Sequence, residues 1–265
     1  MGSLFVTGTP IGNLEDLSYR AERVIREVAL IAAEDTRVTR ALLTRYGIRT
    51  PLISYREANH QRAARQVLDQ LQFTDVALVS DAGMPSIADP GRRLVQAVRA
   101  AGYAVECVPG PSAVTAALSV AGLWADRWLF VGFLPNRRAA RRRALATCAE
   151  RDETIVAYEA PHRLGETLED LAELLPLRTI AVAVELTKRF ECVTRGSPAS
   201  VLEALPGDVR GEAVIVVEGG PGSAKPAPLV STATSRLAAI ARELGVNRRD
   251  LYRFVVEQRQ GRTGP

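Results

Sequence analysis

Three segments rich in glycine and proline each follow an apolar run, and their residue types suit ligand binding. They cover residues 7–13 (TGTPIGN), 80–85 (SDAGMP) and 108–113 (VPGPSA). Glycine lets a backbone approach a ligand closely, and proline fixes a bend and removes a competing donor. In an open parallel sheet, ligands bind beyond the carboxyl ends of the strands. Three such bends at one edge therefore predict a binding site.

The residue types in these bends restrict the ligand. No G-x-G-x-x-G follows the first apolar run, which argues against a dinucleotide site. A Walker loop is also excluded, because Lys188 and Lys225 precede Arg189 and Pro226 rather than serine or threonine. Bends with few cations suit a ligand that is not a polyphosphate, such as one that carries an amino acid, a ribose and a base.

A second chemical signal is the arginine-rich segment 137–143. Its five cations are Arg137, Arg138, Arg141, Arg142 and Arg143. On a helix they would cover most of the circumference, so some must face solvent, where they can contact RNA phosphates. A solvated helix face explains the same pattern, and both interpretations stay open.

The composition is that of an ordinary globular protein. Of the 265 residues, 47% are apolar and 24% charged, with a net charge of +4, which excludes wholesale disorder. All but two of the 34 basic residues are arginine. Arginine binds phosphate and carboxylate through two parallel donors and stacks on bases, although codon bias would produce the same excess.

The cysteines and histidines exclude several metal and redox sites. Three widely spaced cysteines and two histidines cannot form a zinc knuckle, a CxxC pair or a multi-histidine centre. The longest mainly apolar stretch, residues 113–125, is too short to cross a bilayer, and the first residues lack the basic region of an export signal. We therefore expect a soluble cytoplasmic protein without a metal.

The elements that position these residues alternate between strands and helices, which predicts an α/β fold with a mainly parallel sheet in the first half. The expected strands are residues 4–7, 29–33, 52–53, 75–80, 103–108, 128–131, 154–158, 179–184, 190–194 and 213–217. Apolar stripes predict helices around 21–28, 38–46, 67–71, 92–101, 137–149, 162–175 and 201–205.

Composition shifts divide the chain into two domains and a tail. We expect a first α/β domain over 1–124, a second over 125–220, a linker over 219–228 and a helical tail over 229–265. The tail has a helix-turn-helix outline, and a plain helical hairpin explains it as well. Arg248 and Arg249 give the tail a second basic patch.

Nine short blocks of the chain carry a resemblance to a known family. They are TPIGNL (9–14), AAEDTR (32–37), SDAG (80–83), DPG (89–91), PGPSA (109–113), GFLP (132–135), YEAPHR (158–163), ELTK (185–188) and GE (211–212). In this order they resemble the signatures of the bacterial 16S ribosomal RNA cytidine ribose 2′-O-methyltransferases, which belong to the tetrapyrrole-methylase class. The resemblance covers essentially residues 4–219.

The resemblance implies two α/β domains, the second with a mixed sheet, that hold S-adenosylmethionine in the cleft between them in a homodimer. It also implies methylation of a cytidine ribose in 16S ribosomal RNA of the small subunit. Carried over by motif, the cofactor residues are Pro10, Gly12, Asp81, Ala82, Gly83, Met84, Ser112, Ala113, Tyr158, Glu159 and Leu186. The chain departs from the family at Gly8, where proline is usual, and at Met84, where threonine is usual.

Transfer of a methyl group to a ribose hydroxyl needs alignment of the reacting atoms and a base or donors for the developing alkoxide. The candidate catalytic residues are Asp35, Glu159, Glu185 and Lys188. Asp35 follows an apolar strand that aims it at the sheet edge, and a helix N-cap explains it equally well. Glu185 and Lys188 form either a base with an orienting cation or a surface ion pair of little energetic weight.

Two alternatives belong to other functional classes. A methylase of a porphyrin-like or corrinoid ring would share the fold, but those relatives usually carry a glycine-proline-glycine-aspartate turn where this chain has residues 9–13. A non-catalytic RNA-binding protein would use the basic segments, and it would not need three converging bends.

Overall fold

The computed structural model describes residues 1–205, 209 and 211–220, together with the single residues Ala241, Gly245, Asn247 and Asp250. The chain divides into one compact unit over Met1–Ser223 and a second over Ala224–Pro265. The fold and the site described below belong to the first unit. The predicted tail helices, with Arg248 and Arg249, lie outside the described residues.

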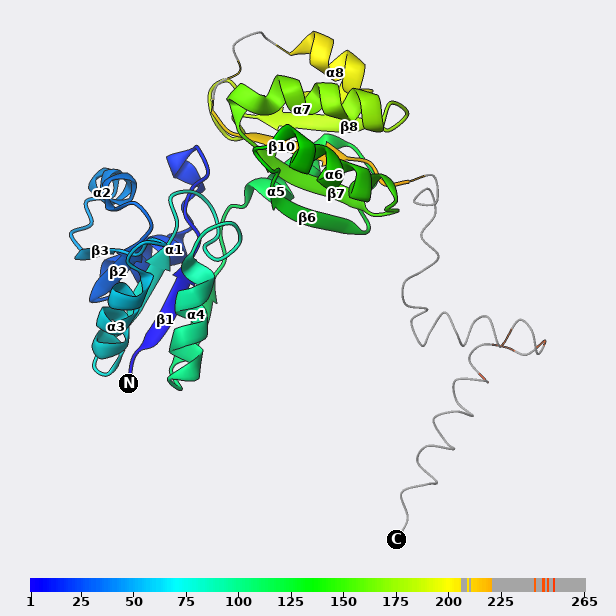
Figure 1. The fold of residues 1–265 in the computed structure, drawn as a ribbon. Coiled ribbons are helices and arrows are strands. Elements are labelled where there is room, and N and C mark those ends of the chain that lie inside the picture. Colours follow the sequence, from blue (N-terminus) through cyan, green and yellow to red (C-terminus); the bar gives the residue numbers. More distant parts are fainter. Residues whose placement is uncertain are drawn as a thin grey trace. The chain divides into compact units, whose positions relative to one another are not determined.

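The first sheet is parallel throughout, as the sequence predicts (Figure 1). Its strand order is β3-β2-β4-β1-β5. The strands are β1 (Ser3–Thr7), β2 (Leu30–Ala33), β3 (Leu52–Ser54), β4 (Val76–Val79) and β5 (Ala104–Val108). Both faces are covered by helices, which is why β4 is buried along its whole length rather than alternating between apolar and polar residues.

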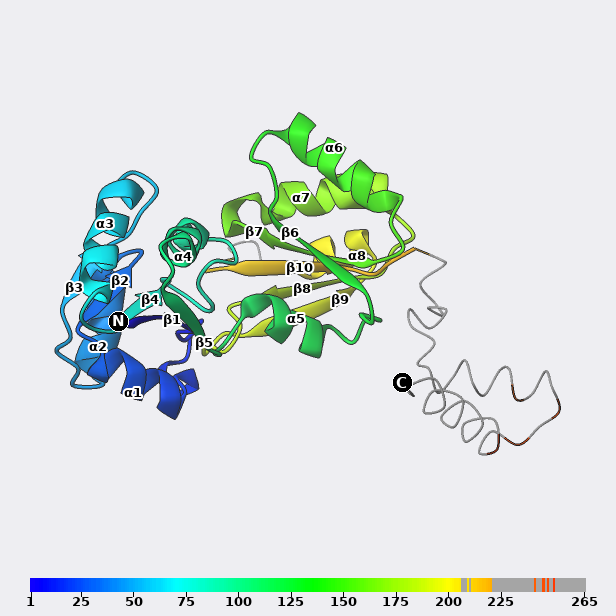
Figure 2. The same cartoon turned by 90° about the horizontal axis from the view of Figure 1, so that it is seen from below.

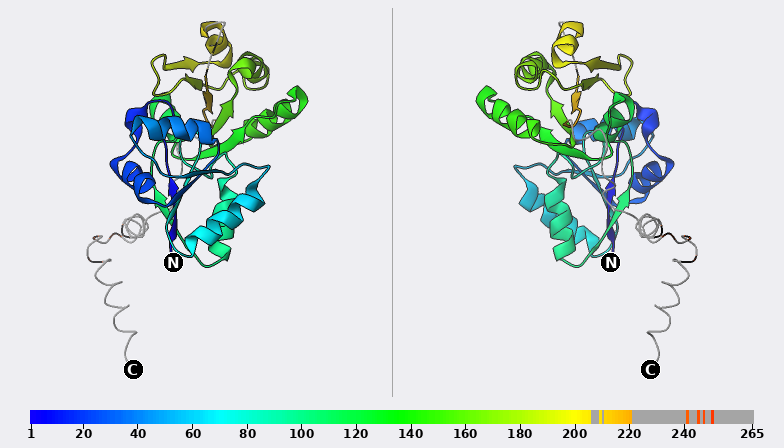
Figure 3. Two further views of the ribbon diagram at one scale, coloured as in Figure 1. Left: turned by 90° about the vertical axis from the view of Figure 1, so that its left-hand side faces the viewer. Right: turned by 90° about the vertical axis from the view of Figure 1, so that its right-hand side faces the viewer.

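Four helices cover the two faces of this sheet. They are α1 (Tyr19–Glu27), α2 (Thr36–Arg45), α3 (His60–Leu71) and α4 (Gly91–Ala100). The first two pack on one face, and the last two lie side by side on the other (Figure 3). The predicted stripe of α2 is wrong at Val38, which is 46% exposed. Thr39 is buried instead, because it precedes Leu42 and Leu43 by three and four residues.

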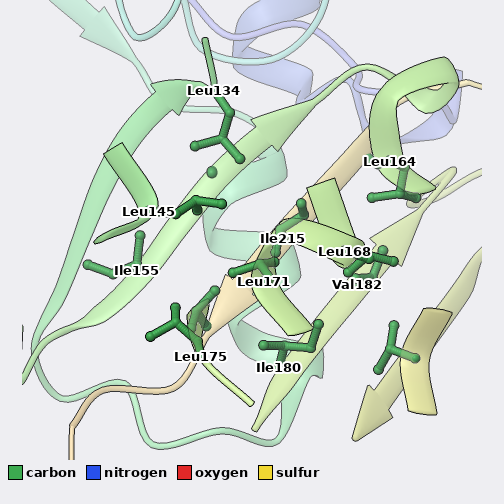
Figure 4. Packing of buried hydrophobic residues seen from close by; sticks show 14 of the residues in the cluster. Leu134, Leu145, Ile155, Leu164, Leu168, Leu171, Leu175, Ile180, Val182 and Ile215 are labelled. Carbon is green, nitrogen blue, oxygen red and sulfur yellow. The ribbon is translucent and has the colours of Figure 1, made fainter. Parts of the chain in front are cut away.

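The second sheet is mixed. Its strand order is β6-β7-β10-β8-β9, in which only β6 and β7 run parallel. The strands are β6 (Trp128–Phe133), β7 (Thr154–Glu159), β8 (Ile180–Val184), β9 (Cys192–Gly196) and β10 (Ala213–Val217). Three helices pack on one face: α6 (Arg138–Ala149), α7 (Pro161–Leu174) and α8 (Pro198–Ala204). Figure 4 shows leucines of α6 and α7 packed against the strands of this face.

The opposite face of the second sheet is covered by α5 (Ala113–Ala121), as Figure 2 shows. The side chains of β10 alternate accordingly, with Ile215 toward α6–α8 and Val214 and Val216 toward α5. The bend at 108–113 therefore leads from the last strand of the first sheet directly into a helix of the second. Among the described residues, no helix is long and apolar enough to cross a membrane.

Candidate functional site

The three glycine- and proline-rich bends meet at one edge of the first sheet, because they follow three neighbouring strands, β4, β1 and β5. The backbones of Thr9 and Gly83 exchange two hydrogen bonds of 3.0 and 3.1 Å. The N–H of Gly8 donates to the carbonyl of Val108 at 3.0 Å. The convergence predicted from the sequence is thus confirmed, and the bends are tied to one another.

Two glycines allow this close approach. A Cβ on Gly8 would lie 2.7 Å from Cα of Gly110 and 2.8 Å from the sulfur of Met84. Gly83 has a φ of 81°, a conformation that L side chains rarely adopt. The two departures from the family pattern, Gly8 and Met84, are therefore neighbours in space, since the methionine sulfur lies over the glycine.

A cavity of about 400 Å³ opens at this edge, within the range of roughly 300–1,000 Å³ that is usual for small-molecule sites. The bends and the ends of the strands of the second sheet line it together. The first half of the chain contributes Ile11, Glu34, Ser80, Asp81, Ala82, Gly83, Met84, Ile87, Ala88, Asp89, Ser112 and Ala113. The second contributes Phe133, Tyr158, Glu159, Ala160, Pro161, Glu212, Ala213 and Val214.

Most of the expected cofactor residues line this cavity. They are Asp81, Ala82, Gly83, Met84, Ser112, Ala113, Tyr158 and Glu159. Three others lie elsewhere: Pro10 is buried, Leu186 belongs to the core between α5 and the second sheet, and Gly12 packs against the 185–188 loop. A Cβ on Gly12 would lie only 2.5 Å from Cγ of Lys188. None of these three residues is among the lining residues of the cavity.

The cavity is acidic. Five of its lining residues carry carboxyl groups (Glu34, Asp81, Asp89, Glu159 and Glu212), and none of the described lining residues is basic. Partial burial, and then the nearby charge of Asp81, raise the pKa of Glu34 above its ordinary value. A surplus of carboxylates in a half-enclosed space favours a cationic ligand.

Aromatic rings form part of the wall. The ring of Tyr158 meets Phe130 edge-on at 4.9 Å and Phe133 in a tilted arrangement at 5.2 Å. Burial, and then the charge of Glu212, raise the pKa of the Tyr158 hydroxyl, so Tyr158 stays neutral at physiological pH. Phe133 is 60% exposed, which leaves its ring accessible to a planar group such as a base.

Asp35 does not line the cavity. Its Oδ1 accepts the backbone N–H of Arg37 at 2.9 Å, which caps α2. Its carboxylate also pairs with the guanidinium groups of Arg37 at 2.6 Å and Arg56 at 3.1 Å. The hydrogen bonds from Arg37 hold the pKa of Asp35 well below its ordinary range. This placement supports the helix-cap interpretation and makes Asp35 a weak base.

Glu159 lines the cavity, but its carboxylate is fully occupied. Oε1 accepts the N–H of Ala160 at 2.7 Å and two N–H groups of Arg163 at 2.9 and 2.5 Å, and Oε2 accepts the hydroxyl of Thr167 at 2.7 Å. The side chain has no exposed surface. Arg163 continues the network to Asn136 in the loop that precedes α6. Glu159 is therefore placed to fix the β7–α7 bend rather than to take a proton.

Glu185 and Lys188 form an ion pair of 2.7 Å outside the cavity wall. Glu185 and Thr187 have positive φ values of 52° and 66°, a strained conformation that persists only where the surroundings enforce it. Thr187 supplies one such contact, since its hydroxyl accepts the N–H of Asn13 at 3.0 Å. The pair thus belongs to the loop that clamps the bend after β1.

The arginine-rich segment divides into paired and unpaired residues. Arg141 is completely buried, with Nε 2.9 Å from Oδ2 of Asp170, so its predicted contact with RNA is wrong. Arg138 and Arg142 also pair with Asp170, at 3.0 and 2.9 Å. Arg137 and Arg143 are exposed, and within the described ranges neither forms an ion pair. The remaining members of the prediction, Arg248 and Arg249, lie outside the described residues.

Sequence reasoning missed several lining residues, among them Glu34, Asp89 and Glu212. All three stand in blocks that carry the family resemblance, AAEDTR, DPG and GE. These blocks were therefore the signal by which the missed residues could have been found. The sequence does not tell, however, which of the adjacent acids Glu34 and Asp35 turns its side chain into the cavity. In the described residues, no group of three or more potential ligands is arranged to hold a metal ion.

Comparisons with known proteins agree with the family resemblance of the sequence blocks. A family model described as "Tetrapyrrole (Corrin/Porphyrin) Methylases" matches residues 3–202. The protein named ribosomal RNA small subunit methyltransferase I from Xylella fastidiosa (strain Temecula1) is 48% identical over 223 residues, which are 82% of each chain. Its namesake from Bacillus subtilis (strain 168) is 43% identical over 221 residues, 83% of this chain and 76% of the relative.

Solved structures share the fold at lower identity. A uroporphyrin-III C-methyltransferase from Thermus thermophilus, complexed with S-adenosylhomocysteine, superimposes with a TM-score of 0.57 at 20% identity, over 82% of this chain and 97% of the other. A cobalt precorrin-4 methyltransferase gives a TM-score of 0.62 at 14% identity, over 82% and 94%.

Proposed function

The chain belongs to the tetrapyrrole (corrin/porphyrin) methylase family, and from this premise we propose that it transfers a methyl group from S-adenosylmethionine to the ribose 2′-hydroxyl of a cytidine in 16S ribosomal RNA. The relatives at 43% and 48% identity support small-subunit ribosomal RNA as the acceptor. The neighbour that holds S-adenosylhomocysteine supports the donor.

One observation carries the proposal: the cavity is rich in carboxylates, and no basic residue is among its described lining residues. When bound, S-adenosylmethionine supplies a methyl group on a positively charged sulfur. Carboxylates around the cavity stabilise such a cation, whereas lysine or arginine at the same place would repel it. The residues present therefore fit the donor.

Some residues of the chain are assigned to contact the donor, and others keep the contacting segments in place. We assign the donor contacts to the bend after β4 with Asp81, to the start of α5 with Ser112, and to Tyr158 of β7, all of which line the cavity. Glu159 holds the β7–α7 bend through Arg163, and the Glu185–Lys188 pair holds its loop against Gly12. Rigid supports of this kind keep reacting groups aligned.

The RNA is proposed to approach over α6. Arg137 and Arg143 are exposed cations that can neutralise phosphates. Phe133, next to the cavity and largely exposed, offers a ring on which an unstacked base can lie. We keep Arg248 and Arg249 as additional proposed contacts.

The proposal extends to assembly and organisation. We propose a cytoplasmic homodimer, with domains at 1–124 and 125–220 followed by the tail at 229–265. Large apolar side chains near the domain boundary, Trp124 at 51% and Trp128 at 43% exposure, are surface that a second subunit can bury. Light scattering of the purified protein tests the dimer.

A tetrapyrrole acceptor is not favoured. The two tetrapyrrole methylases compared above share the fold at 14% and 20% identity, far below the relatives named for ribosomal RNA. A non-catalytic RNA-binding role leaves the acidic cavity without a purpose.

The decisive experiment supplies tritiated S-adenosylmethionine and small ribosomal subunits from a strain that lacks the enzyme. We expect label in 16S ribosomal RNA, on the ribose of one cytidine after nuclease digestion and mapping. Label on a base, or RNA without label although calorimetry shows binding of the methyl donor, would reject the proposed reaction.

A further inference from the structure

The proposed reaction needs a group that accepts the ribose proton, and the interactions of the cavity carboxylates narrow the choice. Glu159 is saturated by four donors. Asp89 accepts the N–H of Ser86 with both oxygens, at 3.0 and 2.8 Å, and the N–H of Gly91 at 2.8 Å. These three hydrogen bonds tie the Asp89 carboxylate to the main chain of its own loop.

Of the remaining three carboxylates, Asp81 already has a structural partner. Its Oδ1 accepts the N–H of Asp35 at 2.8 Å, which joins the ends of β2 and β4. Glu212 is exposed, and its backbone carbonyl holds the N–H of Glu185 at 3.1 Å. Glu34 is half-buried at the end of β2, and no ion pair to its carboxylate is present among the described residues.

The main chain fixes Glu34 from both sides. Its carbonyl oxygen accepts Nε of Arg56 at 3.0 Å, and the N–H of the next residue is held by Asp81. The side chain therefore projects into the cavity from a rigid strand end. A base built on a fixed element can meet a substrate hydroxyl without a large loss of conformational entropy.

The surroundings of Glu34 also suit proton transfer. Burial and the charges of Asp81 and Asp89 raise its pKa, while a hydrogen bond from the Asp81 backbone and the charge of Arg56 act in the opposite direction with smaller effect. A raised pKa brings a carboxylate closer to the pH at which it must take up a proton, which increases its efficiency as a base.

We propose that Glu34 is the general base that removes the proton from the ribose 2′-hydroxyl, an inference that rests on the proposed function. The hydroxyl oxygen forms a bond to the methyl carbon while the carbon–sulfur bond breaks, and the electron pair of that bond stays on sulfur. The proton moves to the carboxylate of Glu34. The positive sulfur and the negative carboxylate both become neutral, so the net charge of the cavity is unchanged.

The test compares Glu34→Gln, Glu34→Asp and Glu212→Gln with the wild type and with Glu27→Gln, an exposed acid on α1 that lies outside the site. Single-turnover methyl transfer to small subunits is measured across pH, and donor affinity is measured by calorimetry. For Glu34→Gln we expect a rate loss of about 10²–10⁴-fold and a donor affinity within about threefold of wild type. The rate of Glu34→Asp should lie between those of Glu34→Gln and the wild type, and Glu27→Gln should match the wild type.

The pH profile separates a base from a structural residue. The wild-type rate should rise with pH to a plateau, with an apparent pKa above the ordinary glutamate value of about 4.3, and Glu34→Gln should lose this limb. The inference is overturned if Glu34→Gln keeps the limb and a rate within about tenfold of wild type. It is also overturned if Glu212→Gln alone shows the large loss, or if saturating donor restores the Glu34→Gln rate.

The same assay distinguishes this failure from failure of the proposed function. A wild-type enzyme that labels no RNA refutes both. A wild-type enzyme that labels the cytidine ribose, together with an equally active Glu34→Gln variant, refutes only the role of Glu34.

Discussion

Nε of Arg141 lies 2.9 Å from Oδ2 of Asp170, and both side chains are completely buried between α6 and α7. Nη2 of the same arginine reaches Glu166 at 3.1 Å, and Arg138 and Arg142 share the Asp170 carboxylate. Part of a segment that looks like an RNA-binding patch in the sequence is therefore a clamp between two helices.

Loss of this clamp should destabilise the fold. Asp170→Ala removes the buried partner of Arg141 and leaves only the largely exposed Glu166 to compensate its charge. We expect a loss of up to about 3–5 kcal/mol in the free energy of unfolding, measured by urea titration. Arg143→Ala is the matched control, since it removes an exposed arginine from the same helix and should change stability by less than about 0.5 kcal/mol. Equal stabilities for the two variants would contradict the clamp.

The clamp should also make stability depend on pH. Burial disfavours the charge on Asp170, but the hydrogen bonds from Arg142, Arg141 and Arg138 outweigh this effect and hold its pKa below the ordinary value. A depressed folded-state pKa stabilises the protein above the unfolded-state pKa, near 3.9, and this contribution disappears as the pH falls through the folded-state pKa. Unfolding measured from pH 5 to pH 3 should therefore show a steeper loss for wild type than for Asp170→Asn. Parallel curves would speak against it.

The unpaired arginines should carry RNA binding. The double variant Arg137→Ala/Arg143→Ala should weaken binding to the small subunit and lower the slope of log affinity against log salt by up to roughly 1.8, because each of the two lost phosphate contacts accounts for about 0.7–0.9. Arg99→Ala, an exposed arginine on α4, is the control. A salt titration that superimposes on wild type would remove α6 from the RNA interface.

The contact between Gly12 and the 185–188 loop should be essential for the donor site. In Gly12→Ala, the new Cβ would lie 2.5 Å from Cγ of Lys188 and 2.9 Å from the carbonyl oxygen of Leu186, so the bend and the loop must separate. We expect at least a tenfold loss of donor affinity, about 1.4 kcal/mol, by calorimetry.

Gly165→Ala provides the comparison for Gly12→Ala. Nothing lies within 4 Å of a Cβ at Gly165, which is in the helix α7. This substitution should leave donor binding unchanged and stabilise the helix by about 0.5–1 kcal/mol. Unchanged affinity in Gly12→Ala as well would show that the loop contact does not shape the site.

The negative charge of the cavity should select a cationic donor. Asp81→Asn retains Oδ1 for the hydrogen bond from Asp35 but removes a charge. Binding of S-adenosylmethionine should weaken on the order of tenfold, while binding of S-adenosylhomocysteine, whose sulfur is neutral, should change little. Glu15→Gln, an exposed acid outside the cavity, controls for net charge. Equal losses for both ligands would argue that Asp81 contacts a part common to the two.

The sequence by itself determined the α/β class, the parallel first sheet and the bends that follow β1, β4 and β5. These features follow from apolar periodicity and from the backbone preferences of glycine and proline, which act within a few residues. The family resemblance placed most of the cavity residues, among them Asp81 and Ser112, because the motifs themselves form the bends.

Only the tertiary structure decided which of two adjacent acids faces the cavity and which arginine is buried. Asp35 was one of four candidate catalytic residues, with a helix N-cap as the equal alternative; it caps α2, while Glu34 beside it lines the cavity. Arg141 is hidden by Asp170, which follows it by 29 residues in the chain. The direction of a side chain at a strand end, and the partner that buries a charge, depend on elements far away in the sequence, and local propensity carries no information about either.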